Sequence, residues 1–416
     1  MKTKLFLPLI FSVLAPVSCQ QNPKTASPDT AAGTDSVSAA AKGTFAYDLD
    51  FLRRHDSVKV LKNASGEAQI IVSAKYQAKV FTSTAAGEQG TSFGWVNYKA
   101  FDKTDPHMNG YGGEDRLWLG PEGNRYSLYF KPGAKMEFAN WHTPAAFDTE
   151  KWEVKTADAR SISLYKDMTL LNYSGTTLKL RVDRDIEVLE NDEIARGLGI
   201  ELKSDIKVVG FRTENTIVNT GDFEWTEKTG APCLWNLDMF NPSPSAVIVI
   251  PYNPDAPGKP ATTDYFGQIP DDRIMYKNGV LYFKADGKSR GKLGIAPQKA
   301  MTYAGSYDAA AKVLTVTRFD VDKSATYLNQ EWNTTASLLK GDAVNAYNDG
   351  PLDDGTQMGP FYEIESVSPA AFLKPSGKLL HRHSVYHFTG NEASLDIIAK
   401  KLLNTSLTEI GAAFSR

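Results

Sequence analysis

The residues from Thr177 to Val188 alternate polar and apolar side chains over about a dozen positions. Successive side chains of a β-strand point to opposite faces, so this pattern predicts a long strand with one face buried. Further runs rich in Val, Ile, Leu, Tyr and Thr, separated by turn residues, predict strands at 69–81, 125–129, 161–165, 206–215, 246–250, 280–284 and 312–319. The chain is therefore expected to be all-β.

Helical patterns occur only near the two ends of the sequence. Residues 47–54 carry apolar side chains at helical spacing, and Ser394 is a candidate N-cap for an apolar stripe formed by Leu395, Ile398, Leu402 and Leu403. We find no internal repeat of 20 to 50 residues, which disfavours a propeller or a solenoid. The expected architecture is a large antiparallel β-sandwich with short helices at the N- and C-terminal ends.

The N-terminal residues have the pattern of an export signal. Lys2 and Lys4 precede an apolar run at 5–17, which is shorter than the roughly 20 residues needed to span a bilayer. The run ends at Ser18-Cys19, and a small residue before a cysteine at this place resembles the lipidation signal of bacterial lipoproteins. The sequence thus predicts a signal peptide at 1–18 and a lipid on Cys19.

The composition of the remaining residues separates a short polar segment from a long folded domain. Residues 19–42 are rich in Ala, Ser, Thr, Asp and Pro and poor in large apolar side chains, so they are expected to form a flexible tether. Residues 43–416 are expected to form a single β-sandwich domain. The predicted location is the bacterial cell envelope, with the protein anchored in the outer membrane and facing the periplasm or the exterior.

Cysteine and charge content narrow the functional classes. If Cys19 carries lipid, Cys233 has no partner, so no disulfide framework is expected. The formal net charge is −3, and the Lys and Arg residues are spread through the chain. This distribution gives no electrostatic footprint for nucleic acid, which we do not expect as a partner.

One stretch near the C-terminus concentrates residues suited to proton transfer. Glu363 and Glu365 alternate along one predicted strand, and His381, His383 and His387 alternate along the next. The two glutamates should therefore share one face of their strand, and the three histidines one face of theirs. A Pro-Ser-Gly turn between the two strands predicts that they pair with each other.

The same stretch resembles a known family. An aromatic residue, Ile364-Glu365-Ser366, Pro-Ala, Leu373-Lys-Pro-Ser-Gly and a strand ending Tyr386-His-Phe follow the order seen in galactose mutarotases and related aldose epimerases. Residues 112–122 and the Val218-Asn219-Thr-Gly221 turn resemble that family more weakly. The whole chain is also similar to a family of bacterial lipoproteins of unknown function, a likeness that supplies no activity.

The mutarotase resemblance implies a supersandwich fold and a carbohydrate ligand, without a cofactor. In the family a carboxylate removes the proton of the anomeric hydroxyl while a histidine protonates the ring oxygen, a division that suits Glu and His. Glu365 occupies the position of the base. Thr220 stands where the family has its histidine, so His107 and His383 are the candidate acids.

Other residues are candidates for binding the sugar. Arg116 lies between Gly-rich sequence and a tryptophan and has donors suited to hydroxyl groups. Trp118, Trp141, Trp235 and Tyr252 could stack on sugar faces. The hypothesis adds three polar candidates, Glu363, Asn219 and His387.

Structural roles are the alternative for these residues. Glu365 could be a buried carboxylate paired with Arg116 or Arg382, and the tryptophans could belong to the core. His381 and His383 could instead share a metal ion, because imidazoles on alternate strand positions lie on one face; a fourth ligand is not identified, and we predict no metal.

Three functions remain open from the sequence. The protein could be a mutarotase-like sugar epimerase or isomerase that uses Glu365 and a histidine. It could be a glycan-binding lipoprotein that keeps a cleft without the acid. It could also be a lyase or hydrolase that acts on an oligosaccharide in a long open cleft.

Overall fold

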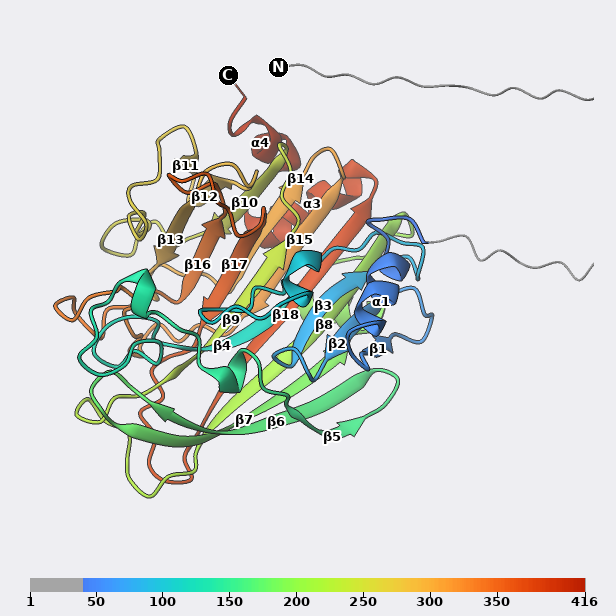
Figure 1. The fold of residues 1–416 in the computed structure, drawn as a ribbon. Coiled ribbons are helices and arrows are strands. Elements are labelled where there is room, and N and C mark those ends of the chain that lie inside the picture. The colour runs from blue at the N-terminus through green and yellow to red at the C-terminus, as the bar shows by residue number, and fades with distance from the viewer. Residues whose placement is uncertain (1–39, 416) are drawn as a thin grey trace, which may run out of the picture. The chain divides into compact units, whose positions relative to one another are not determined.

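Three antiparallel sheets form the framework of the structure, a computed structural model that describes residues 40–415 (Figure 1). The predicted signal peptide at 1–18, the predicted lipidation at Cys19 and most of the predicted tether at 19–42 lie outside the described residues. The prediction of an all-β antiparallel sandwich is confirmed.

The largest sheet has ten strands, which come from residues 153–390. In spatial order these are β11 (Ile274–Lys277), β12 (Val280–Lys284), β10 (Ala246–Pro251), β14 (Tyr303–Asp308), β15 (Val313–Phe319), β18 (Lys378–Gly390), β8 (Ile206–Asn219), β7 (Thr177–Val188), β6 (Ser161–Leu171) and β5 (Glu153–Ala157). Its long strand β7 has the bounds expected from the alternating pattern, with Leu178, Leu180 and Val182 buried.

A five-stranded sheet and a three-stranded sheet complete the β structure. The five-stranded sheet has the order β13 (Gly291–Ile295), β16 (Val344–Asn348), β17 (Tyr362–Val367), β9 (Cys233–Phe240) and β4 (Arg116–Gly120). The three-stranded sheet contains β1 (Lys59–Lys62), β2 (Gln69–Ser73) and β3 (Lys79–Thr84). All strand pairs within the three sheets are antiparallel.

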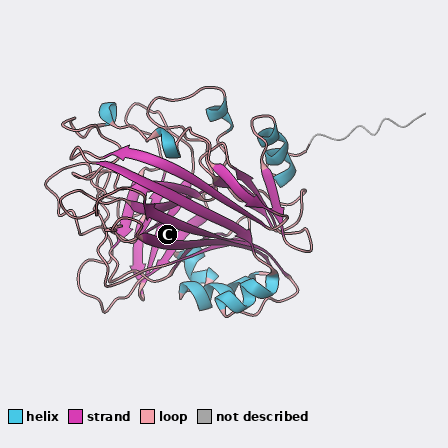
Figure 2. Ribbon diagram, turned by 90° about the horizontal axis from the view of Figure 1, so that it is seen from below, coloured by secondary structure: helices cyan, strands magenta, loops and turns pink. Residues whose placement is uncertain are grey.

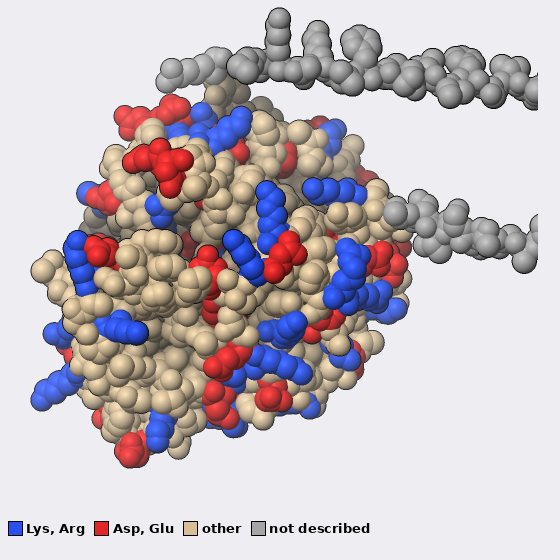
Figure 3. All heavy atoms as spheres, in the orientation of Figure 1, with Lys and Arg blue, Asp and Glu red and all other residues tan. Residues whose placement is uncertain are grey.

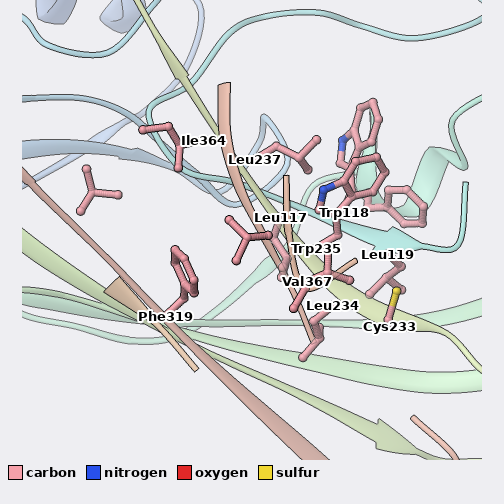
Figure 4. Close-up of a cluster of buried hydrophobic side chains, with 14 of the residues drawn as sticks. Leu117, Trp118, Leu119, Cys233, Leu234, Trp235, Leu237, Phe319, Ile364 and Val367 are labelled. Atoms are coloured by element: carbon pink, nitrogen blue, oxygen red, sulfur yellow. The ribbon is translucent and has the colours of Figure 1, made fainter. Parts of the chain in front are cut away.

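The five-stranded sheet packs one face against the ten-stranded sheet. Leu117, Leu234 and Ile364 of the smaller sheet are buried in the same apolar core as Val385 and Phe319 of the larger one. Figure 4 shows part of this core, with side chains from β4, β9 and β17 packed together. Apolar burial over two facing sheets is the main source of stability in such a sandwich.

Helices cover the outside of the sheets (Figure 2). Helices α3 (Glu392–Leu403) and α4 (Leu407–Ala412) bury an apolar stripe against the outer face of the ten-stranded sheet, where Tyr386 and Phe388 of β18 lie. Helix α1 (Phe45–Arg53) packs on the three-stranded sheet. Helix α2 (Asn191–Leu198) forms part of the connection that leads from β7 to β8. The connections also contain three short 3₁₀ helices, η1 (Tyr98–Phe101), η2 (Phe138–Asn140) and η3 (Ala145–Phe147).

Some details of the sequence predictions are wrong. The strand predicted at 69–81 is two strands, because Gln77 and Ala78 adopt positive φ and reverse the chain. Residues 125–129 lie in a loop in which 126–129 are buried, so their apolar pattern reflects core packing without strand pairing. Helices are not confined to the ends, since α2 lies mid-chain with a capping box at Glu190 and Glu193.

Two predictions about the C-terminal region also fail. The strands before and after the Pro-Ser-Gly turn, β17 and β18, do not pair, because β17 belongs to the five-stranded sheet and β18 to the ten-stranded sheet. The turn therefore carries the chain from one sheet to the other. The N-cap of α3 is Asn391 and not Ser394, since the Asn391 side chain accepts from the backbone N–H of Ala393.

The surface carries mixed charge. On the face shown in Figure 3, Lys and Arg side chains alternate with Asp and Glu, without a large patch of one sign. Within residues 40–415, no helix has the length and apolar content that a membrane crossing requires.

Substitution of Leu180 tests how much the packing of the sandwich core stabilises the fold. The Leu180 side chain is fully buried on the inner face of β7, whereas that of its neighbour Lys179 is exposed. We expect Leu180→Ala to lower the free energy of unfolding by about 2–5 kcal/mol, because it removes apolar contacts and leaves a cavity. Lys179→Ala is the matched control and should change it by less than about 0.5 kcal/mol. Equal effects in urea denaturation would contradict the burial assigned to this face.

Candidate functional site

A cleft of about 910 Å³ opens on the outer face of the five-stranded sheet, opposite to the sandwich core. Its polar lining residues are Asn97, Lys99, Lys103, Asp105, His107, Asn109, Glu122, Thr262, Asp264, Tyr265, Arg290, Lys292, Gln330, Glu331, Asn333, Tyr347 and Asp349. Its aromatic and apolar lining residues include Met108, Phe138, Trp141, Phe266, Trp332, Leu352 and Met358. A concave site with mixed polar and aromatic walls is typical of small-molecule binding.

The strand register explains which side chains lie beneath this cleft. Glu365 of β17 pairs with Leu237 of β9, which pairs in turn with Arg116 of β4, so these three side chains share one face of the sheet. The alternate residues Ile364 and Ser366 point to the opposite face, into the sandwich. Glu363 and Glu365 therefore share one face of β17, as expected, and this face is the one toward the cleft.

Five charged side chains lie at the base of the cleft and form what we call the floor cluster: Arg116, Glu122, Lys292, Glu363 and Glu365. The Lys292 ammonium donates to Oε2 of Glu365 at 3.1 Å, and the Trp235 indole N–H donates to the same oxygen at 2.8 Å. Oε1 of Glu365 is buried and has no hydrogen-bond partner within residues 40–415. Lys292 therefore separates the Glu365 carboxylate from the cleft.

The second ion pair of the floor cluster joins Arg116 and Glu363. Nη2 of Arg116 donates to Oε1 of Glu363 at 2.5 Å, and both side chains are buried. The Arg116 guanidinium also lies 5.0 Å from the centre of the Trp118 ring, a cation–π contact. Arg116 thus bonds a neighbouring glutamate in this structure, which leaves Glu365 to pair with Lys292 and with neither Arg116 nor Arg382.

Burial and neighbouring charges shift the pKa values of the floor cluster. Burial raises the pKa of Glu363 to about 8, against the opposing effect of Arg116, and the nearby Glu365 raises it further. Burial also raises the pKa of Glu122, although Lys292 opposes this shift. For Lys292, burial favours the neutral amine, but Glu365 and Glu122 outweigh it and raise the pKa. The floor cluster thus places two cations, Arg116 and Lys292, among three carboxyl groups.

Aromatic rings form one wall of the cleft. Trp141 stacks nearly parallel to Trp332, with ring centres 6.0 Å apart, and to Tyr129, with ring centres 5.6 Å apart. Phe138 continues the stack beside Trp141 at 6.1 Å. Trp118 lies behind Trp141 and, like Trp235, is buried beneath the cleft lining. We call Phe138, Trp141 and Trp332, which reach the cleft, the aromatic wall.

His107 lies on the same wall and lines the cleft. Its Nδ1 donates to the backbone carbonyl of Trp141 at 2.7 Å, and its ring stacks between Phe138 and His142. This arrangement leaves Nε2 as its free ring nitrogen within the described chain. Among the candidate acids, His107 therefore reaches the cleft.

The histidines of β18 face the other way, into the sandwich. Nε2 of His383 lies 2.7 Å from Oδ2 of Asp238, and its Nδ1 lies 2.9 Å from Oγ of Ser366. The same Ser366 oxygen lies 2.8 Å from Nε2 of His381. Burial lowers the pKa of His381 to about 3, while Asp238 outweighs burial and raises the pKa of His383. His383 is thus enclosed between the sheets and does not line the cleft.

Two further candidates lie in the interior. Nε2 of His387 lies 2.9 Å from Oε1 of Glu114, and its ring stacks on Phe93. Asn219 ends strand β8 and donates to the backbone carbonyls of Phe223 and Leu373, so it holds the loop in place. Neither side chain lines the cleft. Among residues 40–415 no three or more His, Cys, Asp or Glu side chains gather in a way that could hold a metal ion.

Sequence reasoning missed several residues of the site. Lys292 lies in a strand that the sequence did not predict, and its importance comes from a contact with Glu365 that is 73 positions away. Trp332 and Asn333 lie in a loop whose only sequence signal is a Trp among polar residues. Glu122 is the last residue of the 112–122 stretch that resembles the mutarotase family, and the sequence predicted no role for it.

The sequence and fold of this chain can be compared with those of other proteins. A model of a family of unknown function (DUF6786) matches residues 43–414. No curated protein matches by sequence. Among solved structures, the Slr1438 protein of Synechocystis sp. PCC 6803 is similar with a TM-score of 0.50 at 13% identity, over 81% of this chain and 96% of that one.

Two other similar structures carry the mutarotase name. A galactose mutarotase-like protein from Lactobacillus casei ATCC 334 has a TM-score of 0.47 at 9% identity, with 80% of this chain and 100% of that one covered. A galactose mutarotase related enzyme from Lactobacillus acidophilus has a TM-score of 0.43 at 10% identity, with 80% and 97% covered. At these identities the likeness concerns the fold alone, and fold alone does not fix an activity.

Glu363 allows the electrostatics of the floor cluster to be tested by pH. Because its folded pKa of about 8 exceeds its ordinary value of 4.5, the folded state binds more protons between these values. The free energy of unfolding should therefore fall as pH rises through this window. Glu363→Gln, which mimics the protonated acid, should remove this part of the fall. Glu153→Gln, on the exposed strand β5, is the control and should keep the wild-type slope.

Proposed function

Because the chain belongs to the DUF6786 family, whose description assigns no activity, we propose from the cleft itself that the protein binds carbohydrate. The observation that carries this proposal is the aromatic wall of Phe138, Trp141 and Trp332 above a charged floor. The flat C–H faces of sugars pack on aromatic rings, while their hydroxyl groups need hydrogen-bond partners beside those rings.

The cleft supplies both kinds of contact. Trp332 is half-buried and adjoins Asn333, whose side chain belongs to the same loop. Glu122 and Asp349 offer carboxylate oxygens that accept from hydroxyl groups, and Lys292 offers a donor. Polar groups are distributed around the aromatic wall on several loops, which suits a ligand with hydroxyl groups on more than one side.

Binding is favoured over catalysis by the position of the proposed base. The Glu365 carboxylate is fully buried and accepts from both Lys292 and Trp235. A general base must reach the proton that it removes, directly or through one water. Glu365 would have to lose its contact with Lys292 before it could touch an anomeric hydroxyl.

Sugar isomerisation is the second candidate, and one observation favours it. Oε1 of Glu365 lacks a partner among the described residues, and His107 on the cleft wall has Nε2 free. If a sugar displaced Lys292, Glu365 would be the base and His107 the acid. This is the division of roles that the mutarotase resemblance implies.

Trp332 provides the test of carbohydrate binding. We expect saturation-transfer NMR with a panel of mono- and oligosaccharides to detect binding, and Trp332→Ala to weaken it about tenfold or more through loss of apolar contact. Tyr276→Ala is a matched control, because Tyr276 is 40% exposed on β11 and does not line the cleft. Binding that Trp332→Ala leaves unchanged would show that the sugar binds elsewhere.

The same samples distinguish binding from isomerisation. For a binding protein, exchange between the α and β anomers of the bound sugar keeps its uncatalysed rate. Accelerated exchange that is lost in Glu365→Gln and reduced in His107→Asn would instead identify the isomerase. If no sugar of the panel binds and no exchange is accelerated, the carbohydrate proposal is wrong.

We also propose that the protein is a lipoprotein of the cell envelope, anchored through Cys19. The proposal is supported by the charged, apolar and Ser-Cys segments of residues 1–19. In cells fed labelled palmitate, Cys19→Ser should abolish incorporation and release the protein from the membrane fraction. Cys233→Ser is the control, because Cys233 is fully buried and should not carry lipid. Label retained in Cys19→Ser would contradict the anchor.

A further inference from the structure

The mouth of the cleft is more apolar than its floor. Ten large apolar side chains are strongly exposed in the described chain, and four of them line this one cleft: Phe138, Phe266, Leu352 and Met358. Their side chains are 63%, 39%, 46% and 44% exposed. Exposed apolar side chains that are scattered singly need no explanation, whereas a group of them around one opening marks a binding surface.

These four side chains come from separate segments that converge on the opening. Phe138 belongs to η2, Phe266 to the connection between β10 and β11, and the other two to the connection between β16 and β17. Phe266 is held in place by the Arg290 guanidinium, which lies 3.9 Å from its ring centre, and by the edge of Tyr347. A side chain fixed in this way loses little conformational entropy when a ligand covers it.

Two methionines, Met108 and Met358, also line the cleft. A Cβ placed on Gly110 would lie 3.6 Å from Cε of Met108 and 3.7 Å from Sδ of Met358, so both thioether side chains lie over this glycine. Methionine adapts its shape to irregular apolar partners because it is unbranched and polarizable. The mouth thus combines rigid rings with adaptable thioethers above a floor that carries Glu122 and Lys292.

We propose that the ligand is a glycoside, with its sugar on the floor of the cleft and an apolar aglycone at its mouth. The inference rests on the proposed carbohydrate function and adds the chemical class of the ligand. A free monosaccharide would leave the apolar mouth in water. An alkyl or aryl group attached to the anomeric oxygen would instead cover Phe266, Leu352 and Met358, which favours binding by the apolar area removed from water.

Matched glycosides test this proposal. Dissociation constants are measured by calorimetry for methyl and octyl β-D-glucosides and for methyl and octyl β-D-galactosides, below the micelle concentration of the octyl compounds. We expect the octyl member of at least one pair to bind about tenfold or more tightly than its methyl partner. Octyl tetraethylene glycol, which carries the same chain without a sugar, should bind more weakly than that octyl glycoside.

Substitutions at the mouth of the cleft test whether the octyl chain binds there. Leu352→Ser and Met358→Ser should each reduce the octyl preference while leaving the methyl glycoside affinity within about twofold. Leu171→Ser is the matched control, because Leu171 is 48% exposed on β6 and does not line the cleft. All three positions are exposed, and circular dichroism confirms that the variants fold.

Each remaining outcome overturns a stated claim. Equal affinity for methyl and octyl glycosides would overturn the aglycone site and leave carbohydrate binding intact, as would binding of free sugars without binding of glycosides. Octyl tetraethylene glycol binding as tightly as the octyl glycosides would overturn the role of the sugar. If neither glycosides nor free sugars bind, both this inference and the proposed function are wrong.

Discussion

The alternation of side chains across the five-stranded sheet is the constraint on which the rest of the structure depends. Successive residues of β17 serve two different environments: Glu363 and Glu365 face the cleft, while Ile364 and Ser366 face the ten-stranded sheet. A shift of one residue in the register of β17 would bury both glutamates in the sandwich and move Ser366 beneath the cleft. The apolar core, which fixes the register, therefore also fixes the chemistry of the site.

Charge compensation makes the cleft side of that sheet possible. An unpaired carboxylate in a buried position costs far more free energy than a single apolar contact returns, so each buried acid of the floor cluster has a cation beside it. Arg116 lies against Glu363, and Lys292 lies against Glu365. Burial raises the pKa of Glu363 to about 8, which limits the negative charge that the cluster carries. The cleft thus has a floor on which cations and carboxyl groups lie side by side.

The sequence predicts the fold class and the strand faces better than it predicts the site. The bounds of β7 follow from local alternation, because successive residues of a half-buried strand alternate between exposed polar and buried apolar side chains. Strands β4, β9, β13 and β16 were not predicted, since buried strands lack that alternation and carry Gly, Asn and Arg at positions that only tertiary contacts explain. Lys292 illustrates the limit, because no pattern near it in sequence indicates that Glu365 is its partner.

Ser366 joins the two sheets through hydrogen bonds from one hydroxyl group to two histidines. Its single hydroxyl hydrogen lies between two imidazoles, so it can be donated only to one of them while the other donates to its oxygen. His383 also lies against Asp238 through its other ring nitrogen, so Ser366 and Asp238 together fix the orientation of this ring. The chain of hydrogen bonds therefore runs from β18 through β17 and back to β18. The two sheets are matched in polarity as well as in shape, since removal of either imidazole would leave the buried Ser366 hydroxyl with one partner fewer.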